Sequence, residues 1–136
     1  MRIALPALLG LSLLPSLSGE TAEQKFFVEL NSAETVESRC RLNFVVQNKS
    51  DTALDSMKLD LAVFDPDGAI KRRLLTEMAP MRPLKTVVRT FVIDMECMQI
   101  RSLLVNDVVT CTPGNASDCL DELTLSSRLN EVRFYK

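Results

Sequence analysis

The sequence predicts an all-β protein, a single immunoglobulin-like or fibronectin-like β-sandwich of about seven strands that follows an N-terminal signal peptide. Three observations predict this class. Short runs of alternating or β-branched apolar residues recur along the chain, clusters of turn-forming residues separate them, and no long stretch repeats its apolar residues at the helical period.

Residues 1–19 have the layout of a secretory signal peptide. Arg2 precedes an apolar run over residues 3–14, and small residues follow around Ser18 and Gly19, where we expect cleavage. The run falls short of the roughly 20 apolar residues that span a bilayer, so we expect no permanent membrane anchor. The protein is therefore predicted to be periplasmic or secreted.

Residues 20–136 remain after cleavage, enough for one β-sandwich domain with one core. The full chain has 16 basic and 18 acidic residues, which are interspersed and give a formal net charge of −2. This balance argues against nucleic acid as a partner.

The first half of the domain alternates at the period of a β-strand. In KFFVELN, residues 25–31, one side of the strand is apolar. In CRLNFVVQN, residues 40–48, the apolar row includes Cys40, which places this cysteine in the core layer. MKLDLAVF, residues 57–64, repeats the pattern after the polar turn NKSD.

FDPDGAI, residues 64–70, predicts a turn. Asp65 opens it, Pro66 fixes its φ angle and Gly68 allows a positive φ, so a hairpin into AIKRRLLTEM is expected. The aspartates also suggest calcium, but the further ligands of an EF-hand loop are absent from the sequence. We favour the turn.

The second half contains two longer β-prone runs, KTVVRTFVID and IRSLLVNDVVTC, which are apolar on both faces and are predicted to be central strands. Asn106 and Asp107 interrupt the second run, which indicates a β-bulge or, as the alternative, a ligand site at a bend. CLDELTL is expected to form a short helical turn, and NEVRFYK the last edge strand.

FFVELN, CRLNFVVQN, MKLDLAVFDPDG and LLVNDVVTC together resemble a group of small exported proteins of Gram-negative bacteria, labelled Tat pathway signal sequence domain proteins and of unknown function. The resemblance covers nearly all of the mature chain. It implies a fold and a compartment without an activity. This chain departs from the label because Arg2 stands alone and no paired arginines precede the apolar run.

The four cysteines, Cys40, Cys97, Cys111 and Cys119, predict two disulfides in an oxidising compartment. Three pairings are possible. We favour Cys40 with Cys97, which would join two sheets, and Cys111 with Cys119, which would close the loop TPGNASD.

DMECMQI, residues 94–100, offers an alternative use for one cysteine. Met95, Cys97 and Met98 are soft donors that suit Cu(I), and Met78 and Met81 could add to them. The chain has no histidine, and a strand would send Met98 to the opposite face from its two neighbours. Copper handling is therefore the alternative function, and no cofactor is expected.

Catalysis is not expected. A serine or cysteine nucleophile usually depends on a histidine base, and thiol redox chemistry usually uses Cys-x-x-Cys; the sequence has neither histidine nor this spacing. The preferred hypothesis is a periplasmic binding or interaction module with an unknown protein partner. Met78, Met81 and Pro83 in the segment APMRP are the candidate contact residues, although the methionines could instead cap the core.

Overall fold

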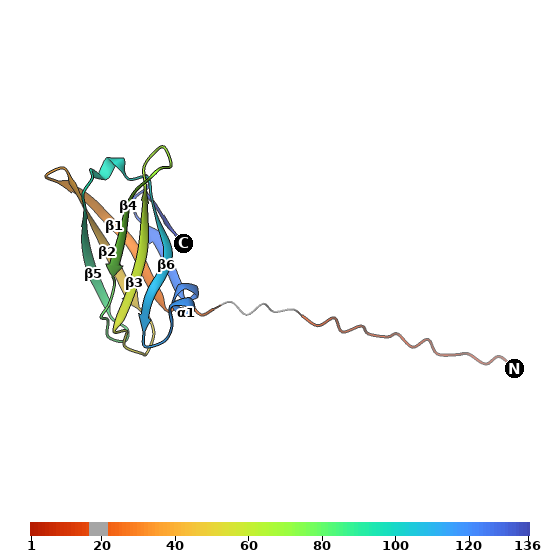
Figure 1. Ribbon diagram of the computed structural model, residues 1–136. Coiled ribbons are helices and arrows are strands. Elements are labelled where there is room, and N and C mark those ends of the chain that lie inside the picture. Colours follow the sequence, from red (N-terminus) through yellow and green to blue (C-terminus); the bar gives the residue numbers. More distant parts are fainter. Residues whose placement is uncertain (17–21) are drawn as a thin grey trace.

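The computed structural model describes residues 1–16 and 22–136 (Figure 1). Residues 1–16 form no regular secondary structure and lead away from the folded domain, whose first strand begins at Phe26. The predicted cleavage position at Ser18 or Gly19 lies outside the described residues. Among the described residues, no helix is long and apolar enough to cross a membrane.

Two four-stranded sheets pack face to face, which confirms the predicted β-sandwich. Their strand orders are β5-β2-β1-β7 and β4-β3-β6-β8. The elements are β1 (Phe26–Val36), β2 (Arg39–Asn48), β3 (Ser56–Phe64), β4 (Ile70–Glu77), β5 (Thr86–Ile93), the 3-10 helix η1 (Cys97–Gln99), β6 (Ser102–Thr112), α1 (Ala116–Asp121), β7 (Leu123–Ser127) and β8 (Arg133–Tyr135).

The chain crosses repeatedly between the sheets. β1 and β2 form a hairpin in one sheet and β3 and β4 a hairpin in the other, while β2 pairs with β5 and β3 with β6, all antiparallel. β7 and β8 instead add in parallel, to β1 and β6 respectively. Parallel neighbours need crossover connections, and the chain reaches both strands by passing from the opposite sheet.

β1 continues beyond its predicted strand, past a β-bulge. The register against β2 shifts between Leu30 and Ser32, so Asn31 is left without a partner. The bulge moves Ala33 to the inner face, opposite Leu42. An extra residue reverses the alternation, and the sequence pattern therefore ends at this point although the strand continues.

β5 lies at the edge of its sheet, so its predicted central position is wrong. Its outer row is exposed and its inner row faces the core. The apolar residues on both faces therefore do not reflect burial on both sides. β6 does lie inside its sheet, between β3 and β8.

The interruption in β6 is the predicted bulge. The register against β3 skips Asn106, since Asp60 pairs with Asp107 and Leu61 with Val105. The Asn106 amide donates to Asp60 over 2.9 Å, and the Asp107 carboxylate accepts from the backbone N–H of Val108. Local contacts of this kind are those expected of a bulge.

The predicted turn at Asp65 is also present. The carboxylate of Asp65 accepts the backbone N–H groups of Asp67, at 3.0 Å, and of Ala69, at 2.9 Å, and Gly68 has a φ of 82°. The Asp65 carboxylate therefore stabilises the turn through hydrogen bonds to its backbone.

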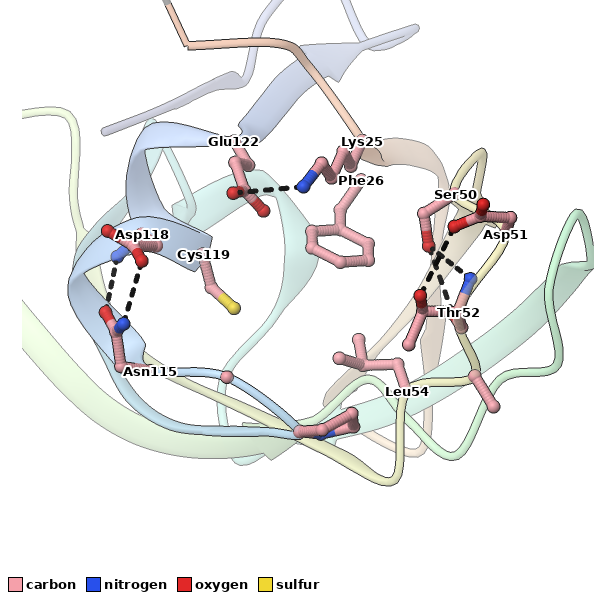
Figure 2. A pocket seen from close by; sticks show the side chains of 13 residues that line it. Lys25, Phe26, Ser50, Asp51, Thr52, Leu54, Asn115, Asp118, Cys119 and Glu122 are labelled. Carbon is pink, nitrogen blue, oxygen red and sulfur yellow. Dashed lines mark hydrogen bonds and ion pairs between the residues drawn. The ribbon is translucent and has the colours of Figure 1, made fainter.

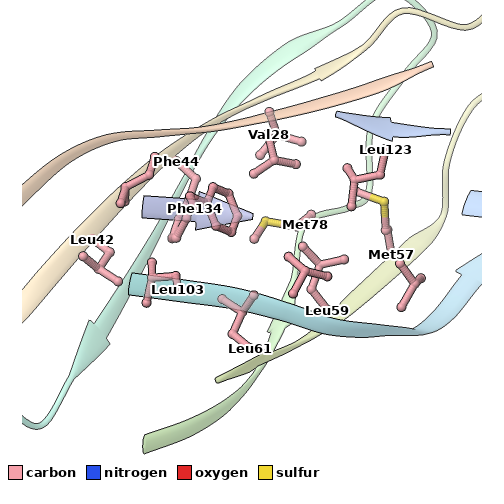
Figure 3. Packing of buried hydrophobic residues seen from close by; sticks show 14 of the residues in the cluster. Val28, Leu42, Phe44, Met57, Leu59, Leu61, Met78, Leu103, Leu123 and Phe134 are labelled. Carbon is pink, nitrogen blue, oxygen red and sulfur yellow. The ribbon is translucent and has the colours of Figure 1, made fainter. Parts of the chain in front are cut away.

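The core fills the space between the inner faces of the two sheets (Figure 3). Phe44 of β2 is fully buried in it, and its ring centroid lies 5.9 Å from that of Phe91 of β5 and 5.4 Å from that of Phe134 of β8. Edge-to-face and tilted aromatic pairs add to the stabilisation that burial gives. The short strand β8 thus contributes Phe134 to the core, packed against Phe44.

Candidate functional site

Two disulfides join the four cysteines. Cys40 of β2 bonds to Cys97 of η1, and Cys111 of β6 bonds to Cys119 of α1, which is the pairing favoured from the sequence. The first bond fixes η1 against the first sheet, and the second fixes α1 against the second sheet.

The soft-metal arrangement at DMECMQI does not form. Met95 is buried, Met98 is 83% exposed, and Cys97 is bonded to Cys40 rather than free as a thiolate. Met98 lies in the short helix η1 and Met95 in the bend before it, so one side chain is buried and the other is exposed to solvent. The predicted metal ligands Met95, Cys97 and Met98 are therefore wrong as a set.

The apolar contact surface expected at APMRP does not form either. Of the three predicted contact residues, Met78 and Met81 are buried and Pro83 is exposed. Met81 exchanges two backbone hydrogen bonds of 2.8 Å with Leu54, and the Met78 N–H donates to Met57. These bonds fix the segment APMRP at the end of the sandwich. Both methionines pack into the core there, so they are not available to contact a partner.

An open cleft of about 380 Å³ lies at the end of the sandwich where β1 begins (Figure 2). Phe26, Leu54 and Cys119 point into it and are themselves almost fully buried, so its floor is apolar. One wall is the loop over residues 50–54, and the other is the segment over residues 113–122. We take this cleft as the candidate functional site, since apolar concavities with a few polar groups are the usual form of binding sites.

Asn48 builds the first wall. It is 1% exposed, and its side-chain amide donates to the carbonyl oxygens of Thr52, at 2.9 Å, and Arg82, at 3.2 Å. Its side-chain oxygen accepts the backbone N–H and the hydroxyl of Ser50. One buried amide therefore sets the course of the loop that ends at Leu54.

Asn115 and the second disulfide build the other wall. Asn115 caps α1, because its side-chain oxygen accepts the backbone N–H of Asp118 at 2.9 Å. The side-chain NH2 of Asn115 also donates to the Asp118 carboxylate over 2.8 Å. Cys119 in the same helix is bonded to Cys111 of β6. The cap and the disulfide together hold this short helix at the edge of the cleft.

The rim of the cleft is charged. Asp51, Asp118 and Glu122 contribute carboxylates and Lys25 contributes one ammonium group, which lies 3.4 Å from the Glu122 carboxylate. The backbone N–H groups of Lys25 and Phe26 both donate to the carbonyl oxygen of Glu122. The rim is therefore rigid around Glu122 and carries more negative than positive charge.

A second cleft, of about 440 Å³, lies between the Asp65 turn and η1. Three of its four charged side chains already have partners within the chain, since Lys71 pairs with Asp65 and Arg72 donates to the Asp94 carbonyl. Its apolar lining is small beside that of the first cleft. It is the weaker candidate for a binding site.

Among the described residues, two carboxylates have a lowered pKa, and both lie outside the first cleft. Hydrogen bonds from Arg73 and then Asn106 lower the pKa of Asp60 on the outer face of the second sheet. The backbone N–H of Ala69 is the largest cause that lowers the pKa of Asp65. Both carboxylates stabilise structure through these bonds.

Sequence reasoning did not find the cleft. Lys25 and Glu122 lie 97 positions apart, so their pairing has no local signal. Two sequence features do belong to the walls of the cleft. One is Asn48, the polar residue that ends an alternating strand, and the other is the loop TPGNASD between two cysteines. Each feature indicates a turn, and only the fold brings the two turns to the same end of the sandwich, where they line the cleft.

Comparison with protein-family models, curated proteins and solved structures finds no match to this chain.

Proposed function

We propose that this chain is an exported, non-catalytic binding module that holds a ligand or a segment of a partner in the cleft bordered by Phe26, Leu54 and Cys119. The observation that carries the proposal is the combination of an apolar floor with a fixed, charged rim. The leader pattern and the two disulfides support a periplasmic or secreted location.

The charges on the rim favour a particular class of ligand. Three carboxylates face one ammonium group, which is already paired with Glu122. A ligand that inserts an apolar group against Phe26 and places a positive charge near Asp51 or Asp118 complements this site. A short peptide with one aromatic and one basic side chain has this chemistry.

The test is a titration followed by amide NMR. The mature protein is mixed with a panel of short peptides that carry one aromatic and one lysine or arginine residue. We expect saturable shifts that are confined to Phe26, Leu54, Gly114 and Cys119 and their neighbours.

Ala53→Trp is the matched variant, because Ala53 lines the cleft and a large side chain there would fill it. Val109→Trp is its control, an exposed position on the other sheet. Shifts that survive Ala53→Trp, or an absence of shifts with every peptide, would contradict the proposal.

A further inference from the structure

Two adjoining pockets lie beside η1, at the end of the sandwich opposite the first cleft. Figure 1 shows η1 and α1 at opposite ends of the sandwich. Each pocket has a volume of about 290 Å³, and Glu131 lines both of them. Ligand pockets usually have volumes of roughly 300–1,000 Å³. Either pocket alone is therefore small for a ligand, while the two together fall within this range.

The first of these pockets is apolar. It is lined by residues of the core cluster that are buried or partly buried, namely Ala33, Cys97, Ile100, Leu129 and Val132. Met98 also lines this apolar pocket, and its side chain is 83% exposed. Methionine is flexible and adapts to apolar ligands of different shape. A ligand with an apolar chain would bury Met98 together with the lining, and the removal of this surface from water favours binding.

The second pocket is basic. It is lined by Arg101, Ser102, Asn130, Glu131 and Arg133. No ion pair within the described part of the chain involves either of these arginines or Glu131. The two guanidinium groups outnumber the single carboxylate, so the side chains of this basic pocket carry an excess of one positive charge. Such an excess complements an anion with a single negative charge.

Both arginines of the basic pocket have contacts that leave N–H groups free. Nη1 of Arg101 donates to the backbone carbonyl oxygen of Glu131 over 3.5 Å. The guanidinium of Arg133 lies over the ring of Tyr135, 4.0 Å from its centroid. A guanidinium has several N–H donors in a planar fork that matches a carboxylate. One long hydrogen bond and one ring contact therefore leave donors available for an anion.

The order of residues along the chain joins the two pockets. Ile100 lines the apolar pocket and its neighbour Arg101 lines the basic pocket, and Val132 and Arg133 repeat this arrangement. The backbone N–H of Arg133 donates to the carbonyl oxygen of Arg101 over 3.2 Å, so the two segments are bonded to each other where the pockets meet. One small ligand can therefore place an apolar group in one pocket and an anionic group in the other.

We propose that the apolar and basic pockets form one binding site for a small amphiphilic carboxylate, of the class of medium-chain fatty acids. The acyl chain lies in the apolar pocket beside Met98, and the carboxylate accepts hydrogen bonds from Arg101 and Arg133. The proposal goes beyond the function proposed for the first cleft, whose acidic rim favours a basic ligand. The two sites lie at opposite ends of the sandwich, and neither proposal depends on the other.

Amide and guanidinium NMR with octanoate tests the site. Octanoate is added to the mature protein below the concentration at which it forms micelles. We expect saturable shifts at the residues that line the two pockets, above all Ile100, Arg101, Val132 and Arg133. Acetate, which has the carboxylate alone, and octanol, which has the chain alone, should shift these signals much less at the same concentration. No saturable shift, equal shifts with acetate or octanol, or shifts confined to the first cleft would overturn the proposal.

Charge variants test the position of the carboxylate. Arg133→Gln should raise the dissociation constant of octanoate about tenfold, because it removes charge-assisted hydrogen bonds. Glu131→Gln should lower the constant about threefold, because it removes the carboxylate that repels the ligand. Arg128→Gln is the matched control, an exposed arginine before the same segment that lines neither pocket, and should leave the constant unchanged. Unchanged binding by Arg133→Gln, or weaker binding by Glu131→Gln, overturns the proposal.

Discussion

Arg89 of β5 donates from Nε to the carbonyl oxygen of Met78, directly after β4, over 3.1 Å. The reverse contact also exists, because Arg72 of β4 donates to the carbonyl oxygen of Asp94, directly after β5, over 2.7 Å. One arginine from each edge thus closes the side of the sandwich where the two edge strands lie. Each satisfies a backbone carbonyl that would otherwise lack a strand partner.

Arg89→Met should lower the free energy of unfolding by about 1–3 kcal/mol, because it leaves the partly buried carbonyl of Met78 without its donor and also removes the bond to the exposed carbonyl of Pro80. Urea denaturation of the purified domain measures this. Arg82→Met, at an exposed position in the adjacent connection, is the control and should change stability by no more than about 0.5 kcal/mol. Equal effects of the two variants would show that the Arg89 bonds contribute nothing.

The two disulfides should differ in their contribution to stability. Replacing Cys40 and Cys97 together by alanine removes a link across a sequence separation of 57, and chain entropy predicts a loss of about 4 kcal/mol. Replacing Cys111 and Cys119 removes a link across a separation of 8, with an expected loss of about 2.5 kcal/mol. Chemical denaturation of both double variants checks the order, and a larger loss for the second pair would contradict it.

The turn at Asp65 should make stability depend on pH. The backbone N–H of Ala69, followed by Lys71 and the backbone N–H of Asp67, lowers the pKa of Asp65 against the opposing effect of burial. A lowered pKa stabilises the folded state fully above the unfolded value of about 3.9, and this contribution is lost as pH falls through the folded pKa.

Asp65→Asn keeps an acceptor for the turn and removes the titration. The stability difference between the wild type and this variant should therefore be largest at neutral pH and shrink as the pH falls below about 4. Asp67→Asn, in the same turn, is the control. Thermal unfolding at a series of pH values measures the difference, and a constant gap between wild type and Asp65→Asn would refute this explanation.

Asn48→Ala should disturb the cleft as well as the fold. Its side-chain NH2 and oxygen bond to Ser50, Thr52 and Arg82, so their loss leaves partly buried backbone groups unpaired, at a cost of about 1–3 kcal/mol. Peptide binding at the cleft should weaken because the wall at residues 50–54 is no longer fixed. The same NMR titration measures this. Unchanged peptide binding in a destabilised variant would show that Asn48 stabilises the fold but does not shape the binding site.

Local patterns were sufficient to predict every strand except β7, where a helical turn was expected, and to favour the disulfide pairing that forms. Cys40 shares its strand parity with Leu42 and Phe44, and this parity alone predicts that it faces the core. The turn at Asp65 and the bulge at Asn106 were also local, since each depends on residues that bond to their near neighbours or to the adjacent strand.

Features that depend on which strands become neighbours could not be predicted. The β-branched residues of β5 indicate a strand, but its place at the edge depends on the crossings of the chain. The sequence left open whether Met81 is exposed or caps the core, and its burial accompanies a β-bridge to Leu54, which lies far away in the sequence. The cleft has the same origin, because it lies between two loops that only the fold brings together.

The proposed function depends on export and on closure of both disulfides, and intact-mass analysis with non-reducing peptide mapping of the protein from its native host tests this most directly. We expect a chain that begins near residue 19 or 20, with Cys40 linked to Cys97 and Cys111 linked to Cys119. A retained leader or free thiols would contradict the account of an exported binding module.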